Sequence, residues 1–195
     1  MTVVRAWRAP VSIALLVIAF DQLTKHWAVT SLGTDREIDV FWTLRFNLGF
    51  NNGMAFGQAQ GFGPLIAVVA TLVIVYLLVT LRNEASRMST IGMGLLIGGA
   101  AGNLIDRLFR GDDGVLRGAV VDFIDFQWFP IFNIADMAIN VGAFLLILNS
   151  ILSARADRRD HRDHPDHASD ESSGDASSDA VDRVEDTTTG VRDDH

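Results

Sequence analysis

Long apolar runs alternate with shorter polar segments over the first 156 residues of the chain. Each run has about 20 residues, the length that a helix needs to cross the hydrocarbon core of a bilayer. The pattern therefore predicts an all-α membrane protein with four transmembrane helices. The predicted spans are residues 9–29, 64–81, 88–108 and 130–152.

The first run also has features of a cleaved signal peptide, because the charged start "MTVVRAWR" precedes an apolar core. However, the helical pattern continues through "DQLTKHWAV" without a clear small-residue cleavage site. We therefore interpret the first run as a retained span.

Arginines in the connections predict the orientation of the spans, because cytoplasmic loops carry an excess of Lys and Arg. Three segments that fall on one side of the membrane are rich in arginine. The connections 30–63 and 109–129, on the other side, are longer, contain acidic residues and have a lower density of arginine. Both termini are therefore expected in the cytoplasm. The arginines on that side are Arg5, Arg8, Arg82, Arg87, Arg155, Arg158, Arg159 and Arg162.

Residues 35–60, in the first external connection, are expected to form a small β-segment on the outer membrane surface. "IDVFWTLRFNLGF" is rich in aromatic and β-branched residues, and Asn51-Asn52-Gly53 is a turn signal. In the third span, Gly94, Gly98 and Gly102 recur every four residues. Such a small-residue stripe lets another helix approach closely, so we interpret it as packing.

The chain is divided by charge near residue 156. The body to residue 156 is neutral, so the net charge of −8 lies in residues 157–195, which have no aromatic residue. Such a tail cannot bury enough apolar surface to fold, so it is predicted to be disordered. Its histidines His161, His164 and His167 are assigned no metal. The absence of Cys excludes disulfides and thiolate chemistry.

Polar residues inside the spans gather toward the predicted outer end. Such residues are expensive in a bilayer and are expected to face the interior of the bundle. Asp21 and Lys25 lie one helical turn apart and are interpreted as a neutralising pair. The third span adds Asn103, Asp106 and Arg107. The fourth carries a polar stripe of Asn133, Asp136 and Asn140.

Asp136 is the residue of the stripe for which a purely structural role is a poor explanation. Interhelical hydrogen bonds are worth roughly 1 kcal/mol each, and amides could supply them without a carboxylate. Asp122 lies in the connection before the fourth span, and a connection that folds back could place it beside Asp136. Two close carboxylates share one proton, so one can act as a base on water while the other polarises a carbonyl.

The polar motifs resemble those of the bacterial lipoprotein signal peptidases, the signal peptidase II family of intramembrane aspartic peptidases. Five blocks match in order along residues 10–153: "DQLTK", "NNGMAFG", "GNLIDR", "VVDFIDF" and "FNIAD". Each block is weak by itself. Their order on the predicted spans makes the resemblance specific.

Carried over to this sequence, the resemblance implies that Asp122 and Asp136 are the catalytic dyad. Asp125 is the second-choice catalyst, and Asp106 is expected to hold Arg107 in place. The segment 111–119 is longer than usual for the family, and its Asp112 and Asp113 are expected to face solvent. The resemblance therefore does not determine the course of the chain between this segment and Asp122. The implied substrate-binding residues are Asn51, Gly53, Asn103, Arg107 and Asn133, with Asp21, Lys25, Asp106 and Asn140 in support.

The implied substrate is a prolipoprotein whose cysteine carries diacylglycerol, and the reaction cleaves the peptide bond just before that cysteine. The expected location is the bacterial inner membrane, with membrane lipids as partners and the active site near the outer face. The chain is expected to be a monomer with no cofactor, no metal ion and no nucleic acid.

Three other functions stay open at this level. Inward-facing carboxylates also serve proton-coupled transporters, although here they gather at one end. Carboxylates with an arginine can bind magnesium and phosphate in a membrane phosphatase, although no series of metal ligands accompanies them. A purely structural membrane protein is the third alternative.

Overall fold

The computed structural model describes residues 3–33, 36–53, 62–80, 86–111, 114 and 116–163. The chain divides into two compact units at Ile151 and Leu152. The predictions for Asp112, Asp113 and the tail from residue 164 lie outside the described residues, as do residues 35 and 54–60 of the predicted β-segment.

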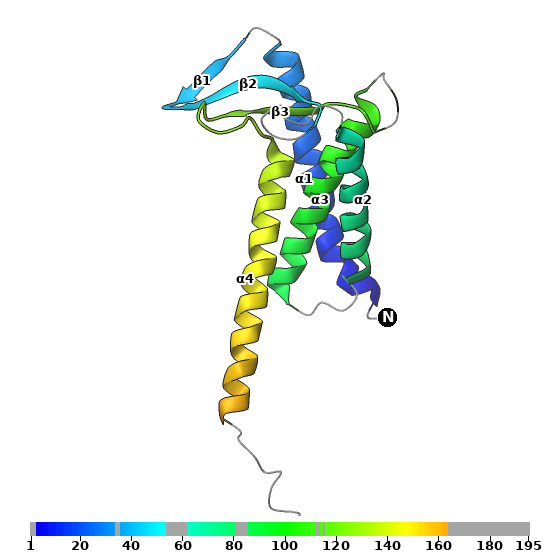
Figure 1. Cartoon of the computed structure of the whole chain (residues 1–195), viewed down its shortest axis with the longest axis vertical. Helices are drawn as coiled ribbons and strands as arrows, with labels where there is room; N and C mark the ends of the chain where they lie inside the picture. Colours follow the sequence, from blue (N-terminus) through cyan, green and yellow to red (C-terminus); the bar gives the residue numbers. More distant parts are fainter. Residues whose placement is uncertain are drawn as a thin grey trace, which may run out of the picture. The chain divides into compact units, whose positions relative to one another are not determined.

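Four helices cover the predicted spans: α1 (Val3–Ser31), α2 (Gly63–Thr80), α3 (Arg87–Phe109) and α4 (Ile134–Asp163). α2, α3 and the stretch Ile134–Ala156 of α4 are long and apolar enough to cross a membrane. The mostly helical architecture is thus confirmed, with spans identified for three of the four helices. Figure 1 shows α1, α2 and α3 running alongside one another, with α4 beside them.

Helix α4 differs from the prediction at both ends. It begins at Ile134 rather than at residue 130, because Asn133 is an N-cap residue outside the first turn. It ends at Asp163, so residues 157–163, expected to be disordered, are helical. The alternating charges of this stretch do not prevent a helix that has already begun from continuing, since elongation is easier than nucleation.

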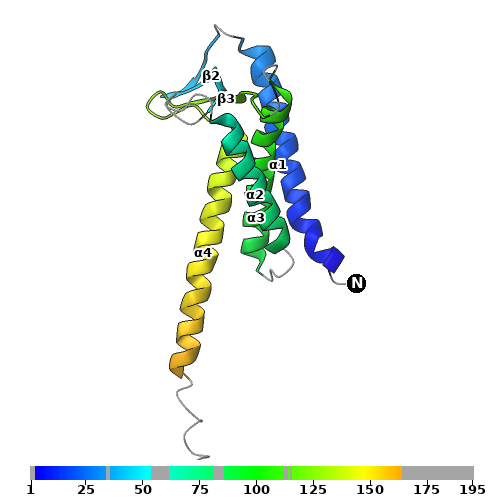
Figure 2. The ribbon, with the colours of Figure 1, turned by 45° about the vertical axis from the view of Figure 1, so that its right-hand side comes forward.

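A three-stranded antiparallel sheet lies at one end of the helices, in the order β1 (Ile38–Phe41), β2 (Leu44–Asn51) and β3 (Val120–Asp125). In Figure 2 the strands lie beside the upper end of α1. β3 was predicted only as a connection, and this was wrong. It pairs with β2 so that Asp122 faces Gly49 and Val120 faces Asn51 across the strands.

A small apolar core joins the sheet to the end of α1. The buried side chains of Ala28 on α1 and of Leu32, just after α1, pack with Val121 and Phe123 on β3. Trp27 adds an edge-on ring contact to Phe46 of β2, with centroids 5.2 Å apart. This core fixes β3, and therefore Asp122, against the helices.

Two faces of α3 carry glycines that allow close helix contacts. The predicted stripe packs against α1: a Cβ at Gly98 would lie 2.7 Å from Val17, and one at Gly102 would lie 2.6 Å from Asp21. A second face, which the sequence analysis did not identify, contacts α4 at Gly92 and Gly99. Glycine is unfavourable inside a helix, so its repeated occurrence in α3 is explained by the close contacts that it allows with α1 and α4.

Replacing Gly99 with Ala tests this packing. A Cβ there would lie 2.5 Å from the backbone oxygen of Ala135, which cannot move without shifting α4. In an exposed helix the same change would stabilise; here we expect destabilisation of about 1–3 kcal/mol, measured by thermal unfolding in detergent. Gly92→Ala is the matched control, with a milder effect, because its nearest contacts are at 3.0 Å and include the flexible Leu146 side chain. Equal or higher stability of Gly99→Ala would contradict the close α3–α4 contact.

Candidate active site

The ammonium group of Lys25 is the centre of a polar network between α1 and α3. Its Nζ lies 2.8 Å from Asp21 Oδ2, 2.8 Å from Asp106 Oδ2 and 2.9 Å from Asn103 Oδ1. The side chains of Lys25, Asp21 and Asp106 are fully buried. All three donors of the ammonium are therefore used, as a buried cation requires. The predicted pairing of Asp21 with Lys25 is confirmed.

The two carboxylates around Lys25 also hold other elements. Asp21 Oδ1 accepts the backbone N–H of Ala135, in the first turn of α4, at 3.0 Å. Asp106 Oδ2 accepts the backbone N–H of Val121, on β3, at 3.3 Å. The network thus joins α1 and α3 to the two segments that carry Asp122 and Asp136.

Asp106 does not hold Arg107, contrary to the prediction. Its Oδ1 accepts hydrogen bonds from Arg110 Nε at 2.7 Å and from Gln22 Nε2 at 3.2 Å. Consecutive residues of a helix point about 100° apart, so Asp106 faces α1 while Arg107 lines a pocket on another side. Neither Gln22 nor Arg110 was singled out from the sequence, although Arg110 stands one turn after Asp106.

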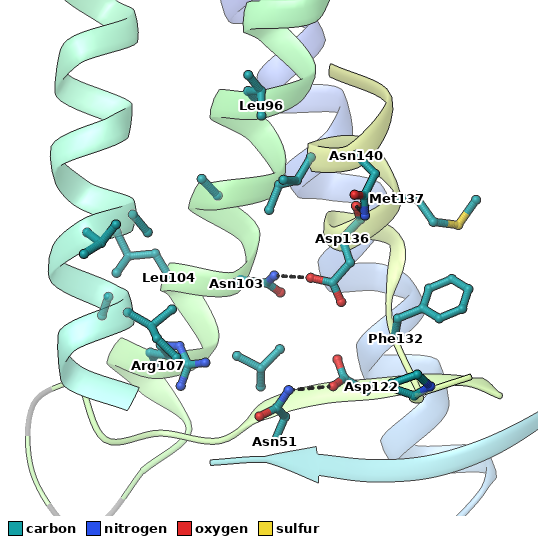
Figure 3. Close-up of a pocket in the computed structure, with 18 of the residues that line it drawn as sticks. Asn51, Leu96, Asn103, Leu104, Arg107, Asp122, Phe132, Asp136, Met137 and Asn140 are labelled. Carbon is teal, nitrogen blue, oxygen red and sulfur yellow. Dashed lines mark hydrogen bonds between the residues drawn. The ribbon is translucent and has the colours of Figure 1, made fainter. Parts of the chain in front are cut away.

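The side-chain amide of Asn103 links Lys25 to Asp136. Its Oδ1 accepts from Lys25 Nζ and, at 3.1 Å, from Asn133 Nδ2. With the oxygen fixed in that direction, its Nδ2 donates to Asp136 Oδ1 at 2.8 Å (Figure 3). The lysine therefore determines which end of the amide faces Asp136.

Asn133 and Asp136 form a capping box at the start of α4. The Asn133 side-chain oxygen accepts the N–H of Asp136 at 3.0 Å, and Asp136 Oδ2 accepts the N–H of Asn133 at 3.2 Å. Asp136 thus lies in the first turn, where the helix dipole favours a negative charge. This arrangement fixes the rotamer of Asp136.

Asp122 lies on β3 and receives amide hydrogen bonds on both oxygens. Asn133 Nδ2 donates to Oδ1 at 2.6 Å, and Asn51 Nδ2 donates to Oδ2 at 3.2 Å. The Asn51 amide is oriented by the turn that follows, because its Oδ1 accepts the N–H of Gly53 at 3.0 Å. Burial, and next the negative charge of Asp136, raise the pKa of Asp122 to about 7, although both amide bonds oppose the shift.

Asp125 belongs to a different environment. Three residues from Asp122 along a strand, it points to the opposite face of the sheet. Burial opposes its ionisation, but hydrogen bonds from the Gln127 N–H, Arg45 and Asn47 outweigh this and hold the pKa of Asp125 below its usual value. Asp125 therefore stabilises the sheet and the loop that follows it.

Asp122 and Asp136 open into one cavity of about 790 Å³ between α2, α3, α4 and the end of the sheet. Arg107 enters the same cavity: its Nη2 donates to the Gly53 oxygen at 3.3 Å, whereas its buried Nη1 has no partner among the described residues. The wall toward α2 and the middle of α3 is apolar. The other predicted site residues in the lining are Asn51, Gly53, Asn103 and Asn140.

Asn140 lines the cavity as predicted, but it points its amide back along the helix. Its Nδ2 donates to the backbone oxygen of Asp136 at 2.9 Å. Asn133 is fully buried, and its side chain contacts Asp122, Asp136 and Asn103. The three residues of the predicted polar stripe therefore have different environments. Asn133 is a buried capping residue, Asp136 is a carboxylate in the cavity, and Asn140 is an amide at the edge of the site.

The longer segment 111–119 does not disturb the path to Asp122. The N–H of Gly118 donates to the Arg107 oxygen at 3.0 Å, and the backbones of Gly111 and Gly118 approach so closely that a Cβ on Gly111 would lie 2.7 Å from Gly118. The chain thus returns to the end of α3 before β3 begins.

Comparison with known proteins identifies the family. A model described as "Signal peptidase (SPase) II" matches residues 13–152. The chain belongs to the signal peptidase II family, and it is therefore a peptidase. Proteins named lipoprotein signal peptidase are 42% identical over 147 residues in Shouchella clausii, covering 73% of this chain and 93% of that protein, and 39% identical over 148 residues in Mycobacterium avium, covering 75% and 81%.

Solved structures agree with this assignment. A structure titled "Bacterial membrane enzyme structure by the in meso method at 2.3 A resolution" matches with a TM-score of 0.66 and 30% identity, covering 74% of this chain and 88% of that one. A second, titled as a bacterial membrane enzyme at 1.9 Å resolution, matches with a TM-score of 0.61 and 31% identity, covering 72% and 90%. The signal peptidase II assignment favours peptide hydrolysis over the transporter, phosphatase and structural alternatives.

Removing the charge of Lys25 tests the network. Lys25→Met leaves two buried carboxylates without their cation, so we expect a loss of about 3–5 kcal/mol in thermal unfolding. Arg110→Gln is the matched control, since Arg110 pairs with the same Asp106 but is partly exposed, and it should cost less than about 1 kcal/mol. Similar losses for the two variants would show that Lys25 is not the centre of the network.

Proposed function

We propose that this protein removes the signal peptide from prolipoproteins by hydrolysing the peptide bond just before a diacylglyceryl-modified cysteine, with Asp122 and Asp136 as its catalytic dyad. The observation that carries the proposal is that these two carboxylates open into one cavity and are both bonded to Asn133. Membership of the signal peptidase II family supports the substrate class.

The two aspartates take different roles. We assign the base to Asp136, because both of its carboxylate oxygens act as hydrogen-bond acceptors, Oδ1 from the Asn103 amide and Oδ2 from the N–H of Asn133. Asp122 is the acid, because burial and the neighbouring charge raise its pKa to about 7, so that it holds the shared proton. Because the two carboxyl groups are coupled, the loss of their shared proton at alkaline pH is a property of the pair and not of one residue.

The reaction follows from this division. Asp136 takes a proton from water while the water oxygen bonds to the scissile carbonyl carbon, and Asp122 gives its proton to the carbonyl oxygen. The resulting tetrahedral species then collapses: the C–N bond breaks, the leaving nitrogen takes the proton held by Asp136, and the hydroxyl proton returns to Asp122. The products are the carboxyl end of the signal peptide and the free amine of the lipidated cysteine.

The surrounding side chains hold the substrate and the dyad. Arg107 Nη1, a buried donor without a partner among the described residues, can bind a substrate carbonyl oxygen. Lys25 acts through Asn103 as a positioning residue for Asp136. The remaining proposed contacts to the dyad or the peptide come from Asn51, Gly53, Asn133 and Asn140, with Asp21 and Asp106 in support.

The protein is proposed to lie in the bacterial inner membrane with both termini in the cytoplasm. The arginines between α2 and α3 and after the fourth span support this orientation. The dyad is then close to the outer face, where water enters. The acyl chains of the substrate remain in the bilayer while the scissile bond reaches the two aspartates, and a single copy of the chain suffices.

Substituting each aspartate tests the dyad. Asp122→Asn and Asp136→Asn keep the size of the side chain but remove the titratable proton, so we expect each to lower cleavage of a lipidated precursor by at least about 10²–10⁴. Asp125→Asn, on the opposite face of β3, should stay active. The assay compares the lipidated precursor with its unlipidated form, and the latter should be left intact. Near-normal cleavage by Asp136→Asn, or cleavage of both precursors at equal rates, would refute the proposal.

The pH dependence tests the assignment of the acid. The proton on Asp122 is lost as the pH rises through about 7, so kcat/KM should fall above that pH. The Asn51 hydrogen bond lowers the pKa of Asp122, so Asn51→Leu should move this fall to higher pH. The test is to measure kcat/KM from pH 5 to 10 for the wild-type protein and for Asn51→Leu. A fall in kcat/KM that moves to lower pH in the variant would contradict the role of Asp122 as the acid.

A further inference from the structure

Two loops at the end of the sheet carry large aromatic side chains that are mostly exposed, although the Trp128 ring also contacts Phe126 and Phe129. Phe41, the last residue of β1, is 79% exposed, and Trp42, in the β1–β2 turn, is 87% exposed. Trp128, in the loop between β3 and α4, is 73% exposed. A hydrogen bond of 3.2 Å from Gln127 Nε2 to the backbone oxygen of Thr43 holds the two loops together. We call Phe41, Trp42 and Trp128 the aromatic ridge.

The backbone at Trp42 is strained. Phe41 pairs with Leu44, so Trp42 and Thr43 form a two-residue turn in which Trp42 has φ of +52°. The first position of such a turn favours Gly, Asn or Asp, because a bulky side chain with positive φ meets its own backbone. Gln127, next to Trp128, also has a positive φ of +66°. An exposed tryptophan at this position gains nothing for the isolated fold, which points to a contact outside the chain.

The ridge lies near the level at which the bilayer surface is expected. The span of α4 begins at Ile134, six residues after Trp128, so Trp128 falls just outside the hydrocarbon core. In Figure 1 the strands run across the direction of the helices, and the β1–β2 turn projects sideways beyond α4. Tryptophan is enriched at this boundary because its ring is apolar and its indole N–H can donate a hydrogen bond.

We propose that the aromatic ridge inserts into the headgroup region of the outer phospholipid leaflet and holds the sheet at a fixed depth. β3 is part of this sheet, so the ridge also sets the depth of Asp122 relative to the bilayer. A substrate polypeptide is the competing partner. The lipid surface is favoured because neither Trp42 nor Trp128 lines the cavity that holds the dyad.

Depth-dependent fluorescence quenching tests the proposal without reference to activity. Variants that keep only Trp42 or only Trp128, with Trp7, Trp27 and the other ridge tryptophan changed to Phe, are placed in phosphatidylcholine vesicles with bromine at different depths of the acyl chains. We expect at least about twofold quenching, strongest for the bromine nearest the headgroups. Unquenched, water-like emission from both tryptophans would overturn the proposal.

A second measurement covers the case in which the single-tryptophan chains do not fold. The chain has no cysteine, so a nitroxide attached to Trp42→Cys reports on this position only. Its collisions with oxygen should exceed those with a water-soluble nickel complex, whereas Glu37→Cys, a charged and exposed position before the same hairpin, should show the reverse. The same water-exposed behaviour at both positions would overturn the proposal.

Trp42→Gly separates anchoring from folding. Glycine relieves the strain, so the variant should unfold at the same or a higher temperature in detergent, yet cleave lipidated precursor about three- to tenfold more slowly in vesicles. Trp42→Phe should restore most of the vesicle activity. An equal loss in detergent, expressed as a raised KM, would assign Trp42 to the substrate and overturn the lipid contact. Because the quenching does not depend on cleavage, failure of the anchor is distinguishable from failure of the proposed peptidase function.

Discussion

The buried ammonium group of Lys25 is the interaction on which the arrangement of the site depends. It has three donors, and each meets an acceptor that also bonds to either α4 or β3. Asp21 binds the first turn of α4, Asp106 binds the backbone of β3, and Asn103 binds Asp136. A buried ion pair is weak evidence for stability, because desolvation offsets much of the attraction. Its value here is geometric, since one cation fixes the segments that carry both aspartates.

The proposed dyad itself opposes stability. Burial, and next the charge of Asp136, disfavour the ionised form of Asp122 and raise its pKa to about 7. The amides of Asn51, Asn103 and Asn133 donate to the two carboxylates and are themselves oriented by other groups: a turn, the lysine and the start of α4. The fold therefore holds two groups that repel each other in fixed positions, an arrangement typical of catalytic sites.

Much of this organisation is visible in the sequence because bilayer-length apolar runs and isolated polar residues inside them are strong signals. The four helices, the turn at Asn51 and the pairing of Asp21 with Lys25 follow from run length and helical spacing. β3 was missed because "VVDFIDF" is buried on both faces of the strand and carries one aspartate on each, so that period-two alternation gives no signal. The start of α4 was placed too early because Pro130, Ile131 and Phe132 extend the apolar run although they precede Asn133, which caps the helix.

The wrong pairing of Asp106 with Arg107 has a similar cause. Proximity in sequence suggested it, whereas the partners are decided by which neighbouring element each helix face meets. The glycines toward α4 were overlooked because they do not share the four-residue spacing of Gly94, Gly98 and Gly102. Tertiary contacts of this kind depend on the relative rotation of two helices, which one sequence does not encode in a simple period.

The central claim is that Asp122 and Asp136 act as one catalytic unit, and a double-mutant cycle tests it most directly. Cleavage of a lipidated precursor is measured for Asp122→Asn, Asp136→Asn and the double variant. If the two carboxylates share one proton in one reaction, the double variant should lose little more activity than either single variant, because groups that act as a unit are not additive. Losses that multiply, with each aspartate contributing independently, would contradict the shared dyad.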